Sequence, residues 1–68
     1  MEKETEKILE NIRRKRIEKK LSLLKLANDL GISHSHLYYI ESKKVIPSID
    51  IIVKIAKALD YPLKKLLD

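Results

Sequence analysis

The side chains that could support acid-base chemistry or bind a metal are gathered in one short segment, at His34, His36 and Glu41. Residues two apart on a helix point in different directions, and a chain of 68 residues has little room for a substrate pocket. The chain has no cysteine, which excludes disulfides and thiolate metal ligands. We therefore expect no catalytic residue, no metal and no cofactor.

The same segment carries a second kind of chemistry, based on hydroxyls and aromatic rings. At about 100° per residue, Leu37 and Ile40 fall on one side of a helix. The opposite side carries Ser35, Tyr38, Tyr39 and Ser42. Because this polar side has no carboxylate, it can hydrogen-bond to DNA base edges and contact thymine methyls without repelling phosphates. The alternative is that the two tyrosines only cover the edge of the core.

Helices must position these side chains, and the spacing of apolar residues predicts five of them. Their expected ranges are about 5–19, 23–30, 34–42, 49–59 and 63–67. Ser22 and Ser33 can cap the second and third helices, Gly31 can end the second, and Pro47 and Ser48 precede the fourth. The sequence thus predicts a single all-α domain over residues 1–68, in which the second and third helices cross steeply at a tight turn.

The charge balance indicates the class of partner. Fifteen Lys and Arg against ten Asp and Glu give a net charge of +5 and an isoelectric point near 9.6, which favours a polyanion such as nucleic acid. The sequence offers no sheet with stacking aromatics, GXXG loop or zinc knuckle for RNA. No stretch is apolar enough to be a signal peptide or to span a bilayer, so we expect a cytoplasmic protein with no membrane partner.

From Ile12 to Leu67, the order of these signals resembles the lambda, 434 and Xre repressor family of Cro/CI-type regulators. The resemblance is carried by Leu21-Ser22, Leu26-Ala27, Gly31-Ile32-Ser33, Leu37, Ile40-Glu41, Pro47-Ser48-Ile49, Ala56, Leu59 and Leu66-Leu67. It implies a compact five-helix fold whose second and third helices form a helix-turn-helix, with the third helix in the DNA major groove. It also implies a transcriptional regulator, in most cases a repressor, that binds a palindromic operator as a homodimer and has no small-molecule substrate.

The resemblance further implies roles for individual residues. His34, Ser35 and Tyr39 match the base-reading positions, with Tyr38 beside them. The phosphate-binding positions fall on the backbone N–H of Leu23 and on Ser42, Lys43 and Lys44. Arg16 and Glu41 match an ion pair between the first and third helices, although Arg16 could instead point to solvent or to a phosphate.

The sequence departs from the family pattern at three positions. Leu23 replaces a common glutamine that contacts phosphate. Lys20 and Lys43 replace common glycines, so a left-handed backbone at either lysine would be strained.

A second apolar stripe predicts a protein partner. Ile51 and Ile55 fall opposite the main buried stripe of the fourth helix, and with Leu63 and Leu67 they could form the face of a homodimer. The alternative is that neighbouring helices enclose the fourth helix on all sides. A protein-interaction or antitoxin-like module on the same scaffold is the rival function, because a fold does not fix a function.

Overall fold

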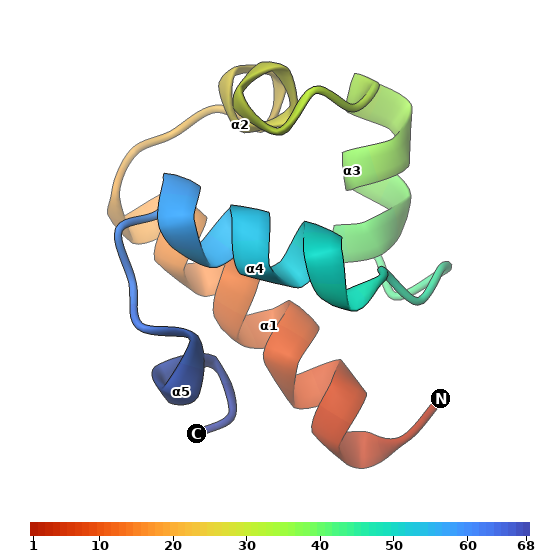
Figure 1. Cartoon of the computed structure of the whole chain (residues 1–68). Coiled ribbons are helices and arrows are strands. Elements are labelled where there is room, and N and C mark those ends of the chain that lie inside the picture. Colours follow the sequence, from red (N-terminus) through yellow and green to blue (C-terminus); the bar gives the residue numbers. More distant parts are fainter.

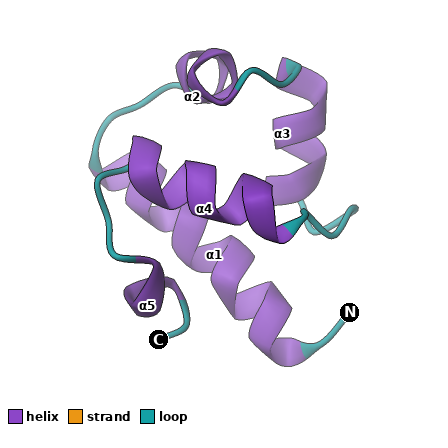
Figure 2. Ribbon diagram, in the orientation of Figure 1, coloured by secondary structure: helices purple, strands orange, loops and turns teal.

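The computed structural model describes all residues 1–68 and contains five helices and no strand (Figure 2). The helices are α1 (Lys3–Glu18), α2 (Leu23–Leu30), α3 (His34–Glu41), α4 (Ile49–Ala58) and α5 (Leu63–Leu66). The expected all-α, five-helix architecture is confirmed. α1 begins earlier than predicted, and Glu4 and Glu6 in its first turn favour this start through the helix dipole.

Serine side chains begin three of the helices. The hydroxyls of Ser22, Ser33 and Ser48 accept hydrogen bonds from the N–H groups of Lys25, His36 and Ile51, at 3.0, 3.0 and 3.2 Å. Each bond satisfies a backbone donor that has no partner within its helix, which favours the helix start by about 1 kcal/mol. The starts of α2, α3 and α4 are therefore fixed by local sequence.

Four helices end in the same hydrogen-bonding motif, although only one of them has a glycine there. The left-handed residues are Lys20, Gly31, Lys43 and Asp60, with φ of 58°, 72°, 65° and 51°. After α3, for example, the N–H groups of Lys43 and Lys44 donate to the carbonyls of Ile40 and Tyr39. A left-handed conformation costs a residue with a Cβ about 1–2 kcal/mol, so the two lysines carry the strain that the sequence predicted.

α2 and α3 cross steeply at the turn that contains Gly31. In Figure 1, α2 is viewed along its axis while α3 runs down the right of the view, and α4 lies below α2 and to the left of α3. α2 packs on α3 and α4, α1 packs on α3 and α5, and α4 also packs on α5. α3 is thus supported from within by α1 and α2.

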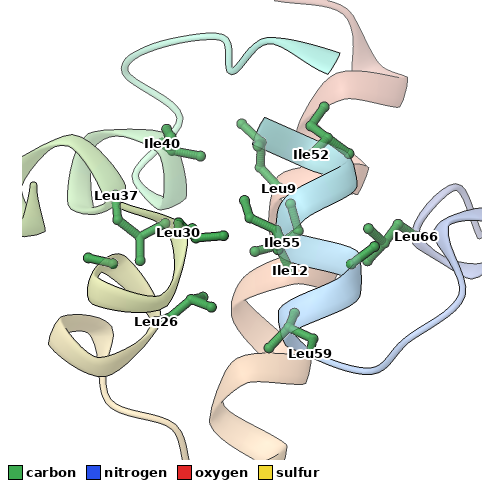
Figure 3. Packing of buried hydrophobic residues seen from close by; sticks show 12 residues of the cluster. Leu9, Ile12, Leu26, Leu30, Leu37, Ile40, Ile52, Ile55, Leu59 and Leu66 are labelled. Atoms are coloured by element: carbon green, nitrogen blue, oxygen red, sulfur yellow. The ribbon is translucent and has the colours of Figure 1, made fainter. Parts of the chain in front are cut away.

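The core draws side chains from all five helices (Figure 3). Its twelve buried members are Leu9, Ile12, Leu26, Ala27, Leu30, Leu37, Ile40, Ile52, Ile55, Ala56, Leu59 and Leu66. Figure 3 shows Leu9 and Ile12 of α1 meeting Ile55 of α4 between the helix-turn-helix and α5. The core therefore holds α3 in a fixed orientation through Leu37 and Ile40.

On α4, Ile55 lies on the buried side rather than opposite it as predicted. Ile55 is fully buried and Ile51 is half-buried against the core, whereas Ile49 is 75% exposed. The prediction that Ile55 belongs to a dimer face is therefore wrong, and the alternative of enclosure by neighbouring helices holds for this residue. Ile52, Ile55 and Leu59 set the stripe that faces the core, while Ile49, at the first helical position, lies outside it.

The buried side of α1 includes polar residues, while one of its isoleucines is exposed. Ile17 is 53% exposed, and Arg16 takes the next position on the side that carries Leu9 and Ile12. Asn11 is buried on the same helix and donates from its side chain to the carbonyl of Leu66 at 2.8 Å. A polar side chain thus ties α5 to α1.

No helix of the chain has the length and the apolar content needed to cross a membrane.

Candidate nucleic-acid interface

The outer side of α3 is an exposed surface of hydroxyls, imidazoles and phenol rings. His34, Ser35 and His36 are exposed, and Tyr38 and Tyr39 are 52% and 46% exposed. The two tyrosine rings are 5.8 Å apart between centroids and tilted by 60°. None of these five side chains makes a hydrogen bond or an ion pair within the chain. Their polar atoms are therefore free to bind a partner.

The inner side of α3 is held by packing and by a bidentate ion pair. Leu37 and Ile40 are fully buried, and Glu41 follows them in the same buried stripe. Arg16 Nε donates to Glu41 Oε2 at 2.8 Å, and Arg16 Nη2 donates to Glu41 Oε1 at 3.0 Å. Arg16 Nη1 also donates to the carbonyl of Leu21 at 2.8 Å. The pair implied by the family resemblance thus joins the end of α3 to α1 and to the chain that leads into α2.

The residues first considered for acid-base or metal chemistry do not come together. His34 and His36 lie on the exposed part of α3, whereas Glu41 is buried and both of its oxygens accept from Arg16. No group of three or more His, Cys, Asp or Glu side chains is placed to hold a metal ion.

The loop after α3 carries the two predicted phosphate-binding lysines, which differ in their surroundings. Lys43 forms an ion pair with Glu10 of α1, while Lys44 has no acidic partner. The hydrogen bond from Lys43 holds the pKa of Glu10 below its ordinary value, and Glu10 raises the pKa of Lys43 in return. Ser42 is half-buried at the end of α3. Lys44 can approach a phosphate directly, whereas Lys43 must first exchange its bond to Glu10.

The start of α2 presents a free backbone donor. The N–H of Leu23 has no acceptor in the chain, since Ser22 accepts from Lys25 instead. The Leu23 side chain is half-buried against the core, and Leu24 is 55% exposed. A leucine at this position therefore adds to packing and leaves only its backbone for a phosphate.

Sequence reasoning missed Glu10 and Asn11. Nothing in the spacing of Glu10 indicated a partner in the loop after α3, because the contact joins residues far apart in the chain. Asn11 did offer a signal, since it stands beside Ile12 and three residues after Ile8 in an apolar stripe. A polar residue in such a stripe often has a buried hydrogen-bond partner.

Comparisons with known proteins agree with this geometry. The sequence model of the helix-turn-helix family matches residues 12–66. Among solved structures, the chain is similar to SinR, described as the master regulator for biofilm formation and crystallised in complex with DNA. The match has a TM-score of 0.80 and 37% sequence identity, and covers 90% of this chain and 98% of the SinR chain. No curated protein sequence matches the chain.

Proposed function

The chain belongs to the helix-turn-helix family of the Xre and Cro/CI type, and on that basis we propose that it is a transcriptional regulator that binds a specific double-stranded DNA sequence. The observation that carries the proposal is the outer side of α3, which is exposed, free of internal hydrogen bonds and free of carboxylates. The likeness to SinR in complex with DNA supports the same partner. Double-stranded DNA as partner agrees with the cytoplasmic location expected from the sequence.

α3 enters the major groove and reads the bases from its first turn and its outer side. His34, Ser35 and Tyr39 contact base edges, since each has a donor or acceptor that no internal bond occupies. Tyr38 adjoins them and also contacts the DNA. The buried inner side of α3 supports this role by keeping the helix in one orientation.

The phosphate contacts come from the elements on either side of α3. The Leu23 N–H, Ser42, Lys43 and Lys44 contact the backbone of the DNA. Binding then releases counterions and weakens as salt rises. Because Lys43 is paired with Glu10 in the free protein, its phosphate contact is the weaker of the two lysine contacts.

A second copy of the chain completes the DNA-bound state. Leu63 and Leu67 are 43% and 63% exposed, and Ile51 is half-buried. Ile49, at 75%, takes the place of the buried Ile55 in this apolar surface. Pairing two copies through this surface presents two α3 helices to successive major grooves, which a palindromic operator matches. An operator occupied in this way is closed to other proteins in the same groove, so we propose repression as the outcome.

The test is selection of bound sites from a random duplex library at near-physiological salt. The best site is then titrated against a scrambled duplex of the same length. The proposal predicts an enriched palindrome bound at least about 1,000-fold more tightly than the scrambled duplex. Salt-sensitive binding without enrichment, or no binding, contradicts it and favours a protein-interaction module that uses the exposed apolar side chains instead.

A further inference from the structure

A cleft of about 390 Å³ opens beside the base of α3, where α1, α2 and α3 meet. It is lined by Arg13, Arg16, Leu23, Tyr38, Glu41 and Ser42. The cleft thus borders the outer side of α3 on the flank that faces α1, and the start of α2 forms one of its walls.

The two arginines in the cleft differ in what they bind. Arg16 uses its guanidinium for Glu41 and the carbonyl of Leu21. Arg13, one turn earlier in α1, is exposed and has no hydrogen bond or ion pair within the chain. The only carboxylate in the cleft, Glu41, accepts from Arg16 with both oxygens. The positive charge of Arg13 is therefore uncompensated.

The other polar groups of the cleft are suited to an anion. Tyr38 and Ser42 each bring a hydroxyl without an internal partner, and the Leu23 N–H is free at the positive end of α2. A phosphate oxygen accepts hydrogen bonds from guanidinium, hydroxyl and backbone N–H groups alike. The cleft therefore offers several donors around one free positive charge.

We propose that this cleft binds one phosphodiester group of the DNA backbone, with Arg13 as its cationic ligand and Tyr38 as a hydroxyl donor. The inference rests on the proposed function and deepens it. It adds α1 to the DNA-binding surface and assigns Tyr38 to a phosphate, which leaves His34, Ser35 and Tyr39 to read the bases. It also supplies a side-chain contact at the start of α2, where Leu23 has no polar group to offer.

The first experiment compares Arg13→Gln with Arg14→Gln, which removes the same charge from the same helix. Arg14 is also well exposed, at 59% for its side chain, but it does not line the cleft, and it bonds to Asn11 and lies near Glu18. Binding to the selected operator and to a random duplex is measured over a range of salt concentrations. Arg13→Gln is expected to weaken both complexes about tenfold at low salt and to reduce the salt slope by about 0.9, the effect of one phosphate contact. Arg14→Gln is expected to stay near the wild type in both.

A second experiment locates the phosphate. Uncharged methylphosphonate groups are placed one at a time along the operator backbone. When the methylphosphonate replaces one particular phosphate of each half-site, the wild type and Arg13→Gln should bind with the same affinity, because the group that Arg13 binds has lost its charge. Equal losses for Arg13→Gln and Arg14→Gln, or a difference that no methylphosphonate position removes, overturn the proposal.

Failure of the proposed function gives a different result. If the wild-type protein binds no sequence preferentially, specific regulation is contradicted. The phosphate site is still tested in that case, because the salt slope measured on random duplex should be lower for Arg13→Gln than for Arg14→Gln. Because both arginines are exposed, both variants are expected to melt within a few degrees of the wild type. Circular dichroism confirms this before binding is compared.

Discussion

The two sides of α3 use the same eight-residue helix for different purposes. The inner side buries Leu37, Ile40 and Glu41 and is held by the bidentate bond from Arg16. The outer side exposes Ser35 and the two tyrosines, whose polar atoms have no partner in the chain. We therefore expect the inner side of α3 to determine stability and the outer side to determine DNA recognition. Substitutions should affect one property at a time according to the side on which they fall.

The largest expected effect comes from breaking the ion pair of the inner side. Glu41→Ala leaves the largely buried Arg16 guanidinium without its carboxylate, which costs about 3 kcal/mol in the free energy of unfolding. Chemical denaturation of the variant measures the loss. The double variant Arg16→Met/Glu41→Leu, which removes both charges, should recover much of it. A single variant as stable as the wild type contradicts the role given to the pair.

The next largest effect belongs to the outer side. Tyr39→Ala is expected to lower the preference for the operator over random DNA by about 1–3 kcal/mol, because a base contact is lost. Its free energy of unfolding should stay within about 1 kcal/mol of the wild type, since the ring is 46% exposed. Titrations on both duplexes, with denaturation as control, separate the two quantities. Equal losses on both duplexes contradict base reading by Tyr39.

In the loop after α3, Lys43 affects both the stability of the protein and its binding to DNA. Lys43→Gly relieves a left-handed backbone with φ of 65°, worth about 1 kcal/mol, but also removes the exposed ion pair with Glu10, so the free energy of unfolding should rise by less than this. The same change removes a charge from the proposed interface and should weaken binding to every DNA sequence alike. Lys20→Gly is the matched control, because it relieves a φ of 58° at the end of α1. It should stabilise the protein without the loss of a proposed phosphate contact, and a destabilised Lys20→Gly variant contradicts the strain argument.

The smallest effect concerns the bond between Glu10 and Lys43. Glu10→Gln removes the competitor for Lys43 and should strengthen binding to all duplexes, by about threefold at low salt. Weaker binding or no change in a low-salt titration contradicts the competition.

The same ion pair makes a pH-dependent contribution to folding. The pKa of Glu10 is lowered by the hydrogen bond from Lys43, so the contribution is present at neutral pH and is lost as the pH falls through that lowered value. The pKa of Lys43 is raised, so the contribution is also lost in strongly alkaline solution, as the pH rises through that value. The difference in melting temperature between wild type and Glu10→Gln should accordingly be largest near neutrality and vanish in acid. A difference that persists in acid has another cause.

Most of the fold could be predicted from short stretches of the sequence. The side chains of Ser22 and Ser33 cap the first turns of α2 and α3 through short-range hydrogen bonds. Gly31 ends α2 in the left-handed conformation that glycine favours. The inner and outer sides of α3 followed from its period because one side is apolar and the other is polar. The prediction worked where a single element decides the outcome.

The sequence was a poorer guide where several elements decide together. α4 has isoleucines around much of its circumference, so its own pattern did not show that Ile55 is buried and Ile49 exposed. Packing against the other helices determines which isoleucines are buried. The bonds of Glu10 and Asn11 join segments that meet only after folding. Contacts of this kind leave little trace in local spacing.

The most direct test of DNA recognition through the outer side of α3 is a titration of the ¹⁵N-labelled protein with its selected operator, monitored by the amide chemical shifts. Recognition through the outer side predicts that the largest shifts fall on α3, on the start of α2 and on the loop with Lys43 and Lys44, with smaller shifts where Leu63 and Leu67 pair with the second copy. Shifts that centre on Ile49 and Leu63 instead, with α3 unchanged, would show that the apolar surface binds the partner and would contradict recognition through the outer side of α3.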